Sequence, residues 1–115
     1  MLFSVATMFV YPSKYEGFGL SGLEAMVAGC PTVLSDIPPF REQLGVLGDV
    51  AWNFGPDDPV ALADRLQEIL ATPSETMSRA RHAGAMVRAH FSWQSTARGY
   101  LDVFERAIRT HRGVR

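Results

Sequence analysis

The chain has 115 residues, of which 47% are hydrophobic and 20% charged, and its formal net charge is −1. This composition excludes a disordered chain and predicts one small domain with a modest hydrophobic core. We expect no nucleic-acid partner.

Charge is distributed unevenly along the chain. Residues 1–75 contain three basic and ten acidic side chains, whereas residues 76–115 contain eight and two. We interpret the basic half as solvated helix faces, the alternative being contact with an acidic partner or peripheral association with an anionic membrane surface. The apolar segment 1–11 lacks a basic leader and is too short to span a bilayer. With Cys30 as the single cysteine, interpreted as buried filler, we expect a cytoplasmic chain.

Short apolar runs alternate with turns marked by glycine and proline, which predicts an α/β fold. We expect strands at 8–11, 32–34 and 50–54, a helix at 20–28, and a short helix at 40–44 after an extended turn at the paired prolines Pro38 and Pro39. Strand, glycine turn, helix and strand form a right-handed crossover whose strands are parallel.

The rest of the chain predicts three helices, capped by Asp58, Ser74 and Ser92. Each has apolar residues at three- and four-residue spacing, and we assign these stripes to the core. The last stripe consists of Trp93, Ala97, Tyr100, Leu101, Phe104 and Ile108. A basic tail at 110–115 is expected to fray.

Two carboxylates in the stretch YPSKYEGFGLSGLEAMVAGCPTVLSD, residues 11–36, carry the candidate site. Glu16 lies in the turn and Glu24 in the first turns of the following helix, so both are expected near the mouth of that helix. A carboxylate accepts a forked pair of hydrogen bonds, which suits the vicinal hydroxyls of a ribose or hexose.

The turn between the two glutamates supplies backbone donors. Gly17 and Gly19 allow the backbone to approach a ligand closely. The amides of Phe18, Gly19, Leu20 and Ser21 are then available to sugar hydroxyls and to a diphosphate, because a helix N-terminus favours anions.

Two other interpretations of the stretch stay open. The run S-G-L-E at 21–24 fits a capping box, in which Ser21 and Glu24 serve only to satisfy backbone donors. The run G-F-G-L-S-G at 17–22, with Asp36 about twenty residues further on, matches the dinucleotide-binding fingerprint. The run Ser13-Lys14-Tyr15-Glu16, however, intervenes between the strand and the first glycine, and few strands follow.

The stretch also resembles the donor-site signature of retaining glycosyltransferases with the GT-B fold, especially glycosyltransferase family 4. That signature has E-x7-E after P-S and before E-A-M-A-x-G-x-P-V-V-x-S. The segment DIPPFREQLGVLGDVAWNFGPDDPVALADRLQEIL resembles the next part of the family, and HFSWQSTARGYLDVFERAI resembles its closing helices. The resemblance thus covers essentially the whole chain.

The resemblance implies transfer of a hexose from a nucleotide diphosphate sugar with retention at the anomeric carbon, without a bound metal or other cofactor. It implies that Glu16 is catalytic and orients the hexose hydroxyls, while Glu24 binds the ribose hydroxyls. The residues between them would contact the hexose and the phosphates through the glycine turn and its amides: Gly17, Phe18, Gly19, Leu20 and Ser21.

Members of this family also have an N-terminal acceptor domain and a first half of the donor domain with basic residues that bind the diphosphate. Neither is recognisable here, and we assign neither Lys14 nor Arg41 to that role. We therefore predict a single partial domain, 1–115, equivalent to the second half of a Rossmann-like donor domain. It would have about three parallel strands flanked by helices, an all-helical C-terminal part and an open sheet edge suited to self-association. A non-catalytic remnant or interaction module is the third interpretation.

Overall fold

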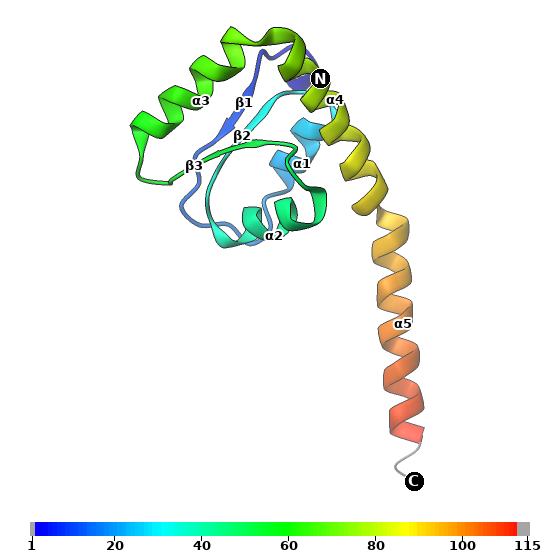
Figure 1. Ribbon diagram of the computed structural model, residues 1–115. Helices are drawn as coiled ribbons and strands as arrows, with labels where there is room; N and C mark the ends of the chain where they lie inside the picture. Colours follow the sequence, from blue (N-terminus) through cyan, green and yellow to red (C-terminus); the bar gives the residue numbers. More distant parts are fainter. Residues whose placement is uncertain (1, 113–115) are drawn as a thin grey trace.

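The structure, a computed structural model, describes residues 2–112. A short 3₁₀ helix, η1 (Leu2–Ser4), precedes the strands and helices drawn in Figure 1. The strands are β1 (Phe9–Tyr11), β2 (Thr32–Ser35) and β3 (Trp52–Phe54). The helices are α1 (Leu20–Val27), α2 (Pro38–Leu47), α3 (Pro59–Ala71), α4 (Pro73–His90) and α5 (Trp93–Arg112).

The three strands form one parallel sheet in the order β1-β2-β3. Phe9 of β1 lies opposite Thr32 of β2, and Val33 of β2 lies opposite Trp52 of β3. All four residues of β2 are buried, as expected for the central strand of a parallel sheet covered on both faces. The predicted α/β fold with three parallel strands is confirmed.

Helices cover the two faces of the sheet unequally. Figure 1 shows α3 on one side and α1 and α2 on the other, with α4 packed against α1. Successive β2 side chains enter different cores because they point to opposite faces. Leu34 packs with Met26 and Phe40 on the α1 side, and Val33 packs with Ile69 on the α3 side.

Close backbone packing fixes α1 against α4. A Cβ atom on Gly84 of α4 would lie 2.8 Å from the carbonyl oxygen of Met26, so only glycine fits there. One turn further along α4, Arg88 donates from Nη1 to the carbonyl oxygen of Val27 at 3.1 Å. The C-terminal end of α1 is therefore in direct contact with α4.

A second set of contacts joins α4 to β3. The guanidinium of Arg79 lies 4.3 Å from the ring centroid of Trp52, and it donates to the carbonyl oxygen of Ala51 at 2.7 Å and to Asp49. The indole of Trp52 donates to Glu68 on α3 at 3.0 Å. That bond is the main reason that the pKa of Glu68 is lowered.

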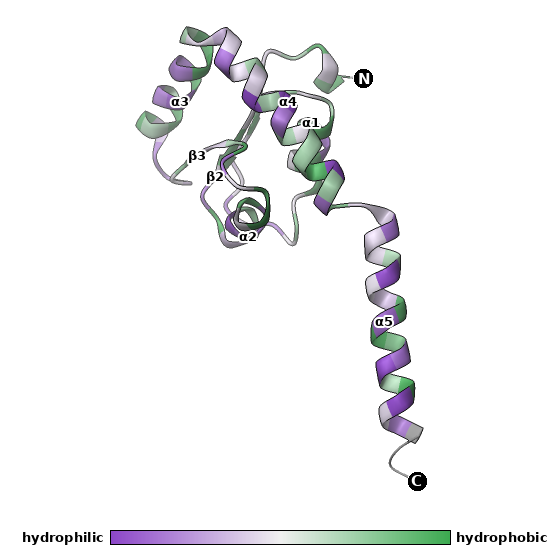
Figure 2. Ribbon diagram, turned by 45° about the vertical axis from the view of Figure 1, so that its right-hand side comes forward, coloured by the Kyte–Doolittle hydropathy of each residue, from purple (hydrophilic) through white to green (hydrophobic). Residues whose placement is uncertain are grey.

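Helix α5 departs from the sequence prediction. Its apolar stripe was assigned to the core, yet the exposed fractions of Trp93, Tyr100 and Phe104 are 82%, 62% and 57%. Figures 1 and 2 show the reason: α5 projects away from the rest of the molecule, and the ribbon segments coloured green for apolar residues along it have no other element beside them. The longest dimension of the molecule is consequently 65 Å, against 28 and 23 Å for the other two.

Three helix starts test the predicted caps. Asp58 accepts from the amide of Ala61 at 2.8 Å and Ser92 from that of Ser95 at 3.1 Å, so both caps are confirmed. Helix α4 begins at Pro73 with Thr72 as its N-cap, so the Ser74 cap is wrong.

Helix α2 is longer than predicted. It begins at Pro38, because both prolines occupy its first turn, where an amide hydrogen is not needed.

The tail predicted at 110–115 is partly helical. Helix α5 continues to Arg112, and residues 113–115 lie outside the described part of the chain.

Candidate functional site

The candidate site lies in the connection between β1 and α1, at the carboxyl end of the sheet. Segment 12–19 connects Tyr11, the last residue of β1, to Leu20, the first residue of α1. The hydroxyl of Ser35, at the end of β2, donates to the carbonyl oxygens of Tyr11 and Ser13. The start of the segment is thereby tied to the neighbouring strand.

Helix α1 begins without a side-chain cap. Its N-cap is Gly19, with φ 81° and ψ 54°, and the helix starts one residue before Ser21. The predicted capping box from Ser21 to Glu24 is therefore wrong, because Ser21 lies inside the first turn. The amide of Gly22 donates to the carbonyl oxygen of Gly19 at 3.3 Å, whereas the amides of Leu20 and Ser21 have no acceptor within the helix and are available to a ligand.

Helix α2 forms the floor beneath the glycine turn. A Cβ atom on Gly19 would lie 2.3 Å from Cε1 of Phe40, so both the space and the positive φ require glycine. From the same face of α2, the side-chain amide of Gln43 donates to the carbonyl oxygen of Phe18. At Gly17 nothing lies within 4 Å of an added Cβ atom.

Glu16 belongs to a small polar cluster. Its Oε1 accepts from the hydroxyl of Ser13 at 2.6 Å. This bond is the main reason that the pKa of Glu16 is lowered, and the nearby Tyr11 hydroxyl adds to the effect. The pKa of Tyr11 is raised, first by burial and then by the neighbouring Glu16, while Ser21 and Ser13 oppose the shift. Glu16 is thus ionised, bonded to Ser13 and close to Tyr11.

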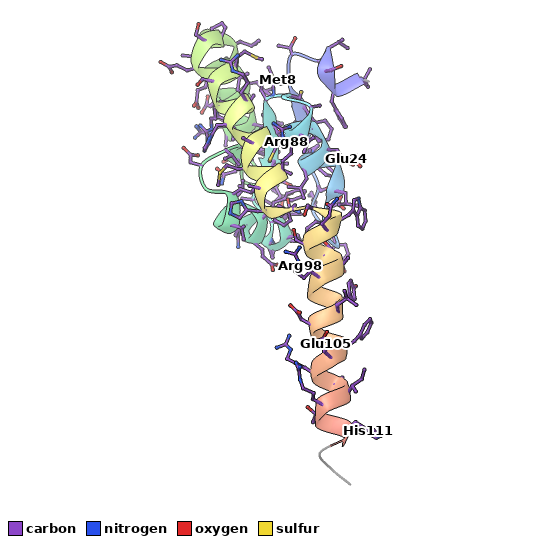
Figure 3. All side chains as sticks on the ribbon, turned by 90° about the vertical axis from the view of Figure 1, so that its right-hand side faces the viewer. Met8, Glu24, Arg88, Arg98, Glu105 and His111 are labelled. Atoms are coloured by element: carbon purple, nitrogen blue, oxygen red, sulfur yellow. The ribbon has the colours of Figure 1, made fainter. Side chains whose placement is uncertain are left out.

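Glu24 is exposed on α1 and lies at the outer edge of the molecule in Figure 3. It follows Ser21 by three residues, so the two side chains share one face of the helix. Within residues 2–112 the carboxylate of Glu24 has no hydrogen-bond or ion-pair partner, unlike that of Glu16. The structure therefore fixes Glu16 through Ser13, in the turn before α1, and leaves Glu24 in the helix itself, open to solvent.

The electrostatic arrangement favours an anion at the start of α1. Arg88 lies at the C-terminal end of α1, where a cation complements the helix dipole. The first turn of α1 contains no acidic residue to offset the positive end of that dipole. The nearby basic side chains are paired, Lys14 with Asp57 and Arg41 with Asp36 at 2.6 Å.

Other features of the described residues are less suited to this chemistry. Two surface hollows, of about 480 and about 380 Å³, lie beside Trp52 and Arg79 and away from the glycine turn. Cys30 is 2% exposed and burial raises the pKa of its thiol, which agrees with its interpretation as filler. Across residues 2–112 no group of three potential metal ligands occurs, and no helix is long and apolar enough to cross a membrane.

Comparison with known proteins identifies the family. The model of the family described as glycosyl transferases group 1 matches residues 1–86. The chain belongs to this family. Membership favours the glycosyltransferase interpretation of the glycine turn over the dinucleotide fingerprint, in which Asp36 would have been a ligand.

Characterised relatives agree with the family match. The chain is 36% identical over 103 residues to a glycogen synthase of Mycobacterium tuberculosis, covering 90% of the chain and 25% of that protein. It is 32% identical over 111 residues to a GDP-mannose:cellobiosyl-diphosphopolyprenol alpha-mannosyltransferase of Xanthomonas campestris, covering 96% and 29%. It is 35% identical over 105 residues to the O-antigen chain mannosyltransferase B of Escherichia coli, covering 90% and 26%.

A solved structure shares the fold. The sucrose-phosphate synthase of Thermosynechococcus elongatus superposes with a TM-score of 0.85 at 28% identity, covering 95% of this chain and 27% of that one. The chain thus has the architecture of part of a GT-B glycosyltransferase. It spans only between a quarter and a third of the length of these relatives.

Sequence reasoning missed three residues that the structure places at the turn: Tyr11, Ser13 and Gln43. The first two could have been suspected, because they end β1 and follow it at the carboxyl edge of the sheet. For Gln43 the sequence offers a weaker indication of a role at the turn. It is a polar residue on the otherwise apolar face of α2, three residues after Phe40 and four before Leu47.

Proposed function

We propose that this chain is the donor-binding portion of a retaining glycosyltransferase of family 4 and that it binds a nucleotide diphosphate sugar. The observation that carries the proposal is the uncapped N-terminus of α1, with free amides on one side and the Glu16 cluster beside it. The name of the Xanthomonas relative includes a nucleoside diphosphate sugar, which supports the donor class.

In this proposal the two glutamates of the E-x7-E motif bind different parts of the donor. Glu16, fixed by Ser13, contacts the hexose beside the diphosphate and orients its hydroxyls. Glu24, unpaired and one turn along α1, accepts a forked pair of hydrogen bonds from the ribose hydroxyls.

The amides act on the phosphates and the sugar. Those of Phe18 and Gly19 donate to the hexose, with Gly17 giving the turn its close approach. Those of Leu20 and Ser21 donate to the diphosphate. Charge that develops on the departing diphosphate is stabilised by these donors and by the helix dipole, which is the role a metal ion has in other transferases.

Complete transfer requires more than this chain. We infer that an N-terminal domain supplies the acceptor site and that a first half of the donor domain pairs with β1. Across the described residues, β1 pairs with β2 alone. Without that partner, the free edge of β1 is the site at which the isolated chain self-associates. We assign the working enzyme to the cytoplasm, with its basic C-terminal half available to an anionic membrane surface.

Calorimetric titration of the chain with UDP-, GDP- and ADP-sugars tests the proposal. We expect saturable binding of one of them, weakened roughly tenfold or more by Glu24→Gln and by Glu16→Gln, since bonds to charged groups contribute about 1.5–3 kcal/mol. Glu42→Gln, which changes an exposed glutamate on α2, is the matched control and should bind normally. Equal affinity in all three variants would overturn the assignment, and binding of a nicotinamide or flavin dinucleotide in place of the sugars would favour the rival one.

A further inference from the structure

The buried side chain of Gln43 carries an inference that rests on the proposed function and deepens it. Gln43 is 2% exposed and belongs to the buried face of α2 with Phe40 and Leu47. Its Nε2 donates to the carbonyl oxygen of Phe18, whereas its Oε1 is buried without a partner among the described residues. A buried polar atom without a partner costs stability. An apolar side chain would suit this face better, so the bond to Phe18 is the feature that distinguishes glutamine.

The bond to Phe18 determines the direction of the next amide. The carbonyl of Phe18 and the amide of Gly19 belong to one trans peptide, in which C=O and N–H point in opposite directions. Because Gln43 draws the carbonyl oxygen towards α2, the N–H of Gly19 points away from α2.

The peptide between Phe18 and Gly19 needs this restraint because glycine allows it two orientations. Gly19 has φ 81°, and rotating the peptide between Phe18 and Gly19 by about half a turn would bring φ to a negative value that glycine adopts equally readily. In the rotated state the N–H of Gly19 would face α2 and a carbonyl oxygen would face the ligand. Such an oxygen would repel the oxygen-rich donor, so one orientation of the peptide binds and the other does not.

We propose that Gln43 is a positioning residue of the donor site, which selects the orientation of the Phe18–Gly19 peptide that offers its amide to the sugar of a nucleotide diphosphate sugar. It acts through the backbone of the turn and does not contact the ligand. Phe40, packed beneath Gly19, limits movement of the turn as a whole, and Gln43 decides the direction of its amide.

Gln43→Met tests the proposal, because methionine has a similar length and no amide. Gln67→Met is the matched control, since Gln67 is exposed on α3 and its side chain forms no hydrogen bond with any of residues 2–112. Thermal unfolding by circular dichroism establishes that both variants fold. Nuclear magnetic resonance of the full chain then provides a readout that needs no ligand.

In the wild type we expect a scalar coupling across the hydrogen bond from Nε2 of Gln43 to the carbonyl carbon of Phe18, and a sharp Gly19 amide signal. In Gln43→Met the Gly19 signal should show exchange broadening as the peptide samples both orientations, while Gln67→Met should match the wild type. A sharp, unshifted Gly19 signal in Gln43→Met would overturn the proposal.

Titration with UDP-, GDP- and ADP-sugars separates this inference from the proposed function. We expect the affinity of the chain for its donor to fall roughly three- to tenfold in Gln43→Met, the range set by one neutral hydrogen bond. Wild-type affinity in a folded Gln43→Met would overturn the positioning role and leave the donor assignment standing. If the wild type binds none of the sugars, the donor assignment fails, and the resonance experiment still decides whether Gln43 orients the peptide.

Discussion

The aromatic rings of Phe18 and Phe91 meet edge to face, with their centroids 6.0 Å apart and their planes at 65°. Phe18 belongs to the glycine turn, and Phe91 is the residue at which α4 ends before α5 leaves the body of the molecule. The candidate site is thus in contact with the point from which α5 projects, although the two residues are far apart in the sequence.

Phe91→Ala should destabilise the chain by about 1–2 kcal/mol, less than truncation of a fully buried phenylalanine, because the side chain is half-buried against the core. Chemical denaturation measures the change in the free energy of unfolding. Phe104→Ala, an exposed phenylalanine on α5, is the control and should change it by less than about 0.5 kcal/mol. Equal effects of the two variants would show that the contact with Phe18 contributes nothing.

Gly19→Ala should destabilise the chain by about 2–5 kcal/mol, since it combines a left-handed backbone with a collision against Phe40. Gly17→Ala, in the same turn, meets open space and should leave the free energy of unfolding nearly unchanged. Thermal and chemical unfolding of the pair compare the two glycines directly. Similar stability of both variants would contradict the close approach of Gly19 to α2.

Tyr11 should ionise late when the pH is raised. Burial and Glu16 raise the pKa of Tyr11 above its ordinary value of 10.0, whereas Tyr15 and Tyr100 are exposed. Because the neutral form is favoured in the folded state, Tyr11 contributes stability below pH 10 that is lost as the pH rises through its folded pKa. Ultraviolet absorbance should show one late ionisation that Tyr11→Phe removes. If the late phase persists in that variant, the cluster around Glu16 is misassigned.

Arg79→Met should destabilise the chain by about 1–3 kcal/mol, because it removes the cation–π contact with Trp52 and the hydrogen bond to Ala51. Tryptophan fluorescence should follow the change as well as the unfolding transition. Arg81→Met, two residues along α4 and exposed, is the control for loss of one positive charge and should behave as the wild type. Equal stability of the two variants would contradict the proposed link between α4 and β3.

The sequence predicted most of the sheet and the central helix because their determinants are local. The apolar run before Tyr11, the glycines at 17 and 19 and the Gly29-Cys30-Pro31 break each restrict the chain within a few residues. Asp58 and Ser92 were found as caps for the same reason. The start of α2 was missed because proline is compatible both with an extended turn and with the first turn of a helix.

The features that escaped prediction depend on distant parts of the chain. The α5 stripe shows the helical period of a buried face, but periodicity does not reveal what covers that face. The role of Gln43 depends on a contact across 25 residues with the carbonyl of Phe18, which no local pattern encodes. The two glutamates were identified from their spacing, and their roles as ligands of a donor stay predictions.

The contact between Arg88 and the end of α1 joins two distant parts of the chain. Arg88 belongs to the basic segment after residue 75, and the carbonyl oxygen of Val27 that accepts its bond lies at the end of the helix that begins at the glycine turn. A guanidinium at that carbonyl compensates part of the negative end of the helix dipole within the last turn. Removing Arg88 should therefore loosen the C-terminal turn of α1 where it packs against α4.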